Sequence, residues 1–168
     1  QGWRVESTWA RGQAWGMHNF AAAYEATGEQ RFLDVAVRMC DWWVDHSPED
    51  HVPFYDFEDP ERHKKPKDSC AATMAATALS RIARYSPDRA DRYRPVAQNI
   101  LTEIAANYLT IGGQVLHGSW GNAVNRWVRP LRFPQEDVMA YGNYYFVEAL
   151  YRQLHEDWSL FELDPAKA

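Results

Sequence analysis

The sequence holds few of the residues that build covalent or metal-bound sites. Its 168 residues include two cysteines, Cys40 and Cys70, and two thiols at this separation match no zinc or redox pattern. We expect buried free thiols, since no sequence by itself establishes the geometry that a disulfide requires. No pair of the six histidines has metal-ligand spacing, so neither a metal nor another cofactor is expected.

Basic residues and long apolar runs are also scarce. Lys and Arg number 18 against 23 Asp and Glu, which gives a formal net charge of −5. A nucleic-acid partner is not expected, because no basic face is available to meet phosphates. A membrane partner is not expected either, since no apolar run approaches the length that spans a bilayer and no signal peptide is visible. The first residue is not Met, which indicates a processed protein or a piece of a longer one.

Aromatic residues, by contrast, are abundant. Eight Trp and nine Tyr exceed what a core of this size usually needs. Such an excess often lines a cleft, and carbohydrate is one natural ligand, because flat aromatic faces pack on sugar rings.

The most informative stretch is residues 7–16 (STWARGQAWG), in which two tryptophans bracket an arginine. Trp9 and Trp15 offer apolar faces for a sugar, and Arg11 offers a charged fork that matches a carboxylate. Gly12 and Gly16 leave room for close approach of a backbone or ligand. The stretch therefore indicates a site for an acidic sugar, although a buried aromatic helix start with a structural arginine has the same residue types.

Apolar periodicity predicts an all-α chain with five helices, at about residues 9–26, 29–46, 69–85, 89–108 and 143–155. Ser7 or Thr8 is expected to cap the first helix, Gly28 to end it, and Asp68 to cap the third, which is rich in alanine. The long connection at 47–67 is typical of a functional loop. The one stretch with an alternating strand pattern is residues 114–116.

The first four helices form two hairpins that resemble each other in plan, which is typical of an α/α repeat architecture. The chain length is that of one ordinary domain, so residues 1–168 are expected to form a single domain. An α/α toroid closes after several hairpins, and this chain supplies two and a half. Either the arc is open, or the other half comes from a missing segment or a second chain.

Four blocks of the sequence resemble the unsaturated glucuronyl hydrolases, glycoside hydrolase family 88. They occur in family order and cover nearly the whole chain: residues 7–16, 52–60 (VPFYDFEDP), 67–72 (KDSCAA) and 141–150 (YGNYYFVEAL). The related family 105 of unsaturated rhamnogalacturonyl hydrolases shares the fold. The resemblance implies a six-hairpin α/α barrel of which this chain is the C-terminal half. The compartment stays open, with the bacterial cytoplasm or periplasm expected, because any signal would precede residue 1.

The resemblance also implies an activity on oligosaccharides that polysaccharide lyases leave with a 4,5-unsaturated uronic acid at one end. In this family an aspartic acid protonates the double bond, water adds at the neighbouring carbon, and the hemiketal collapses, in place of the usual two-carboxylate route. The family's two aspartates lie upstream of this chain. No catalytic residue is therefore expected here.

By position, the resemblance implies substrate contacts from Gln1, Trp9, Arg11 and Trp15. His117 is a further substrate-binding candidate from its loop position, although a histidine bonded to loop backbone is an equal alternative. The expected partners are the unsaturated uronide oligosaccharide and the missing half of the barrel or a second copy.

Other residues are weaker candidates. Asn143 and Cys70 depart from the family pattern, which weakens any role for them, and Asp56 with Glu58 is expected to be solvated or capping rather than an acid/base pair. Two alternatives to the enzyme remain open: a non-catalytic sugar-binding module, and a helical-repeat scaffold whose tryptophans are core.

Overall fold

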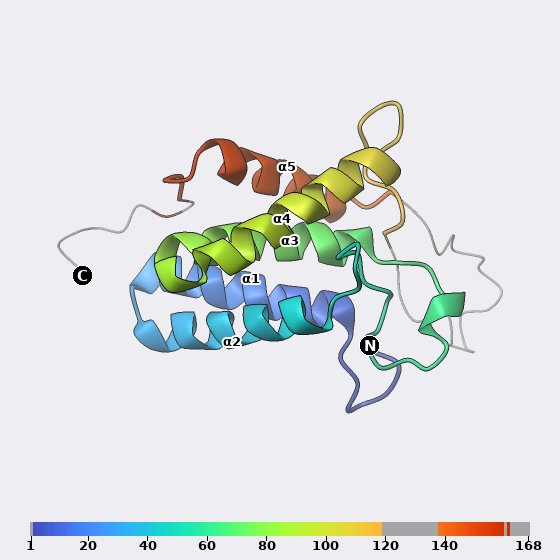
Figure 1. Ribbon diagram of the computed structural model, residues 1–168, viewed down its shortest axis with the longest axis horizontal. Coiled ribbons are helices and arrows are strands. Elements are labelled where there is room, and N and C mark those ends of the chain that lie inside the picture. The colour runs from blue at the N-terminus through green and yellow to red at the C-terminus, as the bar shows by residue number, and fades with distance from the viewer. Residues whose placement is uncertain (1, 119–137, 160, 162–168) are drawn as a thin grey trace.

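The computed structural model describes residues 2–118, 138–159 and 161 (Figure 1). The helices are α1 (Ala10–Thr27), α2 (Gln30–His46), the 3-10 turn η1 (Arg62–Lys64), α3 (Ser69–Tyr85), α4 (Pro87–Asn107) and α5 (Ala140–Leu154). Within these ranges extended pairing is limited to isolated bridges, and residues 114–116 contribute just the bridge between Leu109 and Val115. The all-α class and the five predicted helices are confirmed.

Two of the three predicted helix signals are confirmed. Gly28 ends α1 in the left-handed conformation, with φ of 72°. The Asp68 side chain caps α3 by accepting the backbone N–H of Ala71. The prediction for the start of α1 is wrong: Trp9 is its N-cap without a side-chain bond. Ser7 Oγ donates instead to a carboxylate of the 47–67 loop.

Two helices begin earlier than the apolar pattern predicts. α4 begins at Pro87, two residues before the expected start, because proline at the first helical position is pre-organised and its missing N–H is not needed there. α5 begins at Ala140, three residues before the expected Asn143. The first turn of α4 is polar, so apolar periodicity carries no signal there, while Gly142 interrupts the helical pattern in the first turn of α5.

The helices form an open arc centred on α3. α3 packs against α1, α4 and α5, while α1 pairs with α2 and α3 pairs with α4 as hairpins (Figure 1). α1, α3 and α5 begin at the same end of the arc, where hydrogen bonds join their first residues. The N-termini of three helices, each with the partial positive charge of the helix dipole, therefore meet on one side of the molecule.

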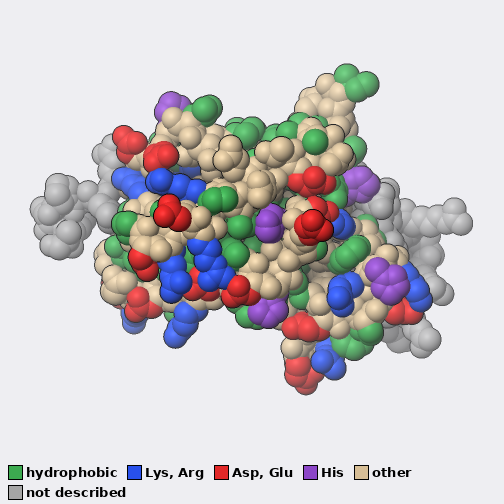
Figure 2. All heavy atoms as spheres, viewed as in Figure 1, with side chains coloured by type: hydrophobic (Ala, Val, Ile, Leu, Met, Phe, Trp, Pro, Cys, Tyr) green, Lys and Arg blue, Asp and Glu red, His purple; other side chains and the backbone are tan. Residues whose placement is uncertain are grey.

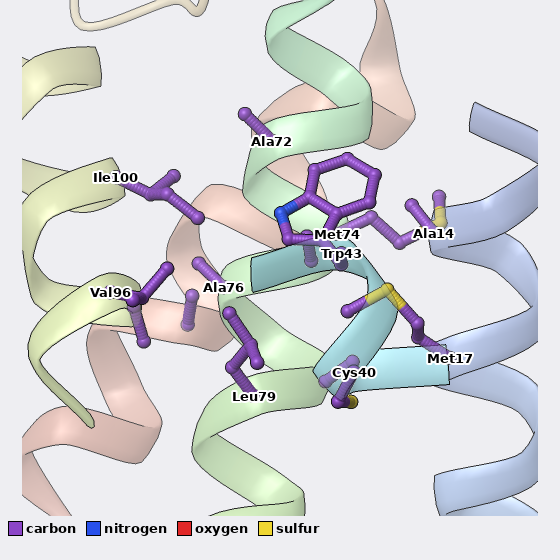
Figure 3. Packing of buried hydrophobic residues seen from close by; sticks show 14 of the residues in the cluster. Ala14, Met17, Cys40, Trp43, Ala72, Met74, Ala76, Leu79, Val96 and Ile100 are labelled. Atoms are coloured by element: carbon purple, nitrogen blue, oxygen red, sulfur yellow. The ribbon is translucent and has the colours of Figure 1, made fainter. Parts of the chain in front are cut away.

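The core lies between α1, α2 and α3 and extends to α4. The fully buried Trp43 of α2 belongs to the same cluster as Met17 of α1 and Met74 of α3, and Ile100 of α4 lies across from Met17 (Figure 3). The alanines of α3 are buried, so its neighbours approach closely, as predicted: Ala71, Ala72, Ala75, Ala76 and Ala78. Cys40 is buried in this core as a free thiol.

A buried ionic cluster joins α1, α3 and α5. Glu148 Oε1 of α5 accepts hydrogen bonds from Arg81 Nη2 of α3 and from Arg152 Nε, each at 2.9 Å. Glu25 Oε2 of α1 lies 3.4 Å from Arg81 Nε, and His18 Nε2 lies 3.8 Å from Glu148 Oε2. Burial by itself raises the pKa of Glu148, but His18 and the two guanidinium groups outweigh it and lower the pKa to about 2. The cluster thus ties three helices together through charge.

The outer face, formed by α2 and α4, carries charged side chains of both signs. Arg92 of α4 binds Asp41 at 3.0 Å and also contacts Asp45, both of α2. In Figure 2 basic and acidic side chains lie next to one another across this face. None of the helices in the described ranges is long and apolar enough to cross a membrane.

Candidate functional site

The candidate site lies where the first turns of α1, α3 and α5 meet. Arg11 of α1 donates from Nε and Nη2 to Asp68 Oδ2, at 3.1 and 2.9 Å, and from Nη1 to the hydroxyl of Tyr141 on α5 at 2.8 Å. The side chains of Arg11 and Asp68 are 6% and 0% exposed. Burial would lower the pKa of Arg11, but Asp68 outweighs it and raises the pKa, so the guanidinium is charged. Arg11 therefore has the structural role that the sequence analysis gave as an alternative: it joins the starts of α1, α3 and α5.

Two aromatic rings lie close to this guanidinium. The centre of the Arg11 guanidinium is 5.5 Å from the Trp9 ring and 5.4 Å from the Tyr141 ring. Trp9 also lies against Tyr55, with ring centroids 6.1 Å apart. The buried Nε1 of Trp9 has no hydrogen-bond acceptor among the described residues. A donor of this kind is suited to a hydroxyl of a bound molecule.

Trp15 lies about one turn beyond Arg11 on α1 and is 39% exposed. Its ring meets Tyr145 of α5 edge-on, at 6.4 Å, and Tyr145 in turn lies 4.9 Å from His18 of the ionic cluster. Trp15 therefore offers an accessible aromatic face, and its ring is held in place by the contact with Tyr145.

The room left by the two glycines is filled by the protein itself. A Cβ on Gly12 would lie 2.9 Å from Cε3 of Trp9, and a Cβ on Gly16 would lie 2.9 Å from Sδ of Met39. Gly12 thus lets the Trp9 ring lie against the first turn of α1. The ligand-approach alternative is not needed to explain either glycine.

Two acidic residues of the 47–67 loop hold the segment that precedes α1. Asp56, 1% exposed, accepts from the backbone N of Trp3 at 2.8 Å and from Ser7 Oγ at 2.7 Å. Glu58 accepts from both the backbone N and the hydroxyl of Thr8. Asp56 is therefore buried rather than solvated, and its partners are those of a structural carboxylate.

His117 lies in a loop fixed against the start of α3. Its backbone is in the left-handed region, with φ of 62°, and its carbonyl accepts from Ser69 N at 3.2 Å. Its ring meets Tyr108 edge-on at 5.4 Å. Asn143 Oδ1 accepts from the backbone N of Val115 at 2.7 Å, so this departure from the family pattern has a structural use that the sequence did not signal.

Cys70 lies behind the site. Its thiol is buried and free, and burial together with Asp68 raises its pKa to about 12, which favours the protonated thiol at neutral pH. A Cβ on Gly142 would lie 2.7 Å from Cys70 Sγ, which explains the glycine in the first turn of α5. Within the described ranges no group of three or more His, Cys, Asp or Glu side chains could hold a metal ion.

Comparisons with known proteins give this site a family context. No family model matches the chain. Over 160 residues it is 34% identical to an unsaturated glucuronyl hydrolase of Formosa agariphila, a match that takes in 91% of this chain and 38% of that protein. The crystal structure of unsaturated glucuronyl hydrolase from Bacillus sp. GL1, responsible for the degradation of glycosaminoglycan, matches with a TM-score of 0.80 at 32% identity. The chain is homologous to the unsaturated glucuronyl hydrolases.

The match covers part of each relative. The five helices correspond to part of the α/α barrel of the unsaturated glucuronyl hydrolases, with 93% of this chain on 42% of the Bacillus chain. A Streptococcus agalactiae enzyme mutant complexed with dGlcA-GalNAc6S matches with a TM-score of 0.79 at 26% identity, over 95% of this chain and 42% of that chain. The chain thus spans about two fifths of the length of these relatives.

The structure brings some of the predicted residues together. Trp9 and Arg11 lie at the meeting point of three helix starts, and Trp15 lies beside it on α1. His117 lies at the edge of the same region through its bond to Ser69, while Gln1 lies outside the described residues. Tyr141 was missed as a site residue, although it stands in a family block. Asp68 was expected as a cap, but its pairing with Arg11 had no local signal.

Proposed function

We propose that this chain forms the substrate-binding part of a glycosidase for oligosaccharides that end in an unsaturated uronic acid. The observation that carries the proposal is the charged Arg11 guanidinium close to two aromatic rings, at an end where three helices begin. Positive helix ends and a guanidinium attract a carboxylate, and the half-buried Trp9 and exposed Trp15 provide faces for sugar rings. The homology supports this substrate class.

The reaction we propose is hydration of the 4,5 double bond. An acid gives a proton to one carbon of the double bond, water adds its oxygen to the other and loses a proton, and the hemiketal collapses to release the sugar. Residues of this chain bind and orient the uronic acid. Asp56 and Asp68 are engaged by several donors each, which supports placing the acid on the part of the barrel that this chain does not cover.

A row of exposed apolar side chains on α5 supports a larger assembly. Tyr144, Val147, Tyr151 and Leu154 follow one another at helical spacing, and each is between 43% and 79% exposed. Apolar stripes of this kind mark a packing surface. We propose that further hairpins of the barrel, such as those the relatives carry in their remaining length, pack on this face. The chain by itself is then expected to self-associate, which size-exclusion chromatography with light scattering measures.

The experiment that tests the function follows the ultraviolet absorbance of an unsaturated disaccharide. It compares this chain with a longer protein in which this chain is joined to the N-terminal hairpins of the barrel. We expect the absorbance to fall with the longer protein and to stay constant with this chain. Loss with this chain alone would show a catalytic carboxylate here, with Asp56, Asp68 and Asp137 tested first. Binding without loss in either protein favours a non-catalytic sugar-binding module.

A further inference from the structure

Two of the three hydrogen bonds that Arg11 donates end on one carboxylate oxygen. Its Nε and Nη2 both donate to Asp68 Oδ2, which closes one side of the guanidinium fork. A guanidinium has five N–H groups, and the third bond, from Nη1 to the Tyr141 hydroxyl, leaves one N–H on each terminal nitrogen. Neither of these two has an acceptor among the described residues, and they are the donors available to a second carboxylate.

Asp68 itself is fixed by its own backbone surroundings. Its Oδ1 accepts from Ala71 N at 3.2 Å as the cap of α3, and its backbone N donates to Pro53 O at 2.8 Å. The carboxylate therefore has one direction, set by the axis of α3 and the 47–67 loop. A planar fork bound on one side by a fixed carboxylate has little freedom to rotate.

We infer that Asp68 is a positioning residue, which holds the Arg11 guanidinium in the orientation that binds the sugar carboxylate. This inference rests on the proposed function. It differs from a helix-capping role alone, because capping uses Oδ1 while the arginine is held by Oδ2. It also means that recognition uses the direction of the N–H groups in addition to charge, since Asp68 offsets part of the charge of Arg11.

The test is Asp68→Asn, because asparagine caps a helix about as well as aspartate. The matched control is Asp59→Asn, which removes a carboxylate of similar burial that pairs with Lys65 in the same loop. Binding of an unsaturated uronide disaccharide and of its methyl ester is followed by tryptophan fluorescence. We expect D68N to weaken binding of the acid about tenfold or more and of the ester far less, with D59N close to wild type.

A double variant and a ligand-free measurement complete the test. Adding D68N to Arg11→Gln is expected to weaken binding of the acid no further, because Asp68 acts through Arg11. Equal losses for acid and ester in D68N, or additive losses in the double variant, would overturn the inference.

If wild type binds neither ligand, the proposed function fails, while hydrogen exchange of the Arg11 Nε–H still tests positioning. Exchange should be fast in D68N and slow in D59N and wild type; equally slow exchange in D68N contradicts the inference.

Discussion

Replacing Glu148 by glutamine would show how much the buried ionic cluster stabilises the fold. Glu148 is 5% exposed and binds Arg81 and Arg152 at 2.9 Å each. Glutamine keeps the shape and one acceptor oxygen but removes the charge, so two buried guanidinium groups would share the one remaining carboxylate of the cluster, Glu25. Breaking a buried ion pair from one side typically costs about 3–5 kcal/mol.

The pKa of Glu148 gives a second route to the same magnitude. Its value falls from 4.5 to about 2 in the folded protein. Each unit of difference between folded and unfolded states corresponds to about 1.4 kcal/mol, so the charged form stabilises the fold by roughly 3 kcal/mol. Because the folded pKa is the lower one, this stabilisation is complete above about pH 4.5 and is lost as the pH falls towards 2.

The assay is urea unfolding of wild type and Glu148→Gln, followed by circular dichroism at pH 7 and pH 3. We expect a difference of about 3 kcal/mol at pH 7 and less than half of it at pH 3. Glu29→Gln is the control, because its ion pair with Arg31 is 48% and 73% exposed and should contribute below about 1 kcal/mol.

A difference between wild type and Glu148→Gln that is under about 1 kcal/mol, or that does not change with pH, would refute the reasoning. If the glutamine variant does not fold, the double variant Arg81→Met with Glu148→Met provides the comparison. It removes one charge of each sign and is expected to be more stable than either single variant, because neither partner is left unpaired. A double variant less stable than both would contradict the coupling.

Other predictions concern the candidate site and the thiols. Gly142→Ala should destabilise the protein by about 1–3 kcal/mol in thermal unfolding, because the new Cβ meets Cys70 Sγ, and adding Cys70→Ala should restore most of the loss; no rescue would mean that the contact is not the cause. Cys40 and Cys70 should react with a thiol reagent in urea and not in the native protein, since burial raises the pKa of both; rapid native reaction would argue against the packing. Arg11→Ala should cost a few kcal/mol of stability, because it leaves Asp68 buried without its guanidinium, and Arg11→Ala with Asp68→Asn should recover part of that cost; equal melting temperatures for these two variants would contradict it.

The sequence by itself determined the helices and two of their local end signals. Apolar periodicity is a property of neighbouring residues, so it located five helices, and Gly28 and Asp68 act through backbone groups a few residues away. The motif around Trp9 and Arg11 was also readable, because its residues are adjacent in sequence and resemble a family block. Where the first turn lacks apolar residues, as at Pro87, the local pattern missed the helix start.

The tertiary structure alone decided which charges meet. Arg11 is 57 residues from Asp68 and 130 from Tyr141, and Arg81 is 67 from Glu148, so no local pattern could pair them. A distant partner also explains why the predicted cap of α1 was wrong. Ser7 donates to a carboxylate 49 residues away and does not cap the helix. Local periodicity fixes which residues face inward, but a buried charge is stable only beside a partner, and folding alone brings that partner from another helix.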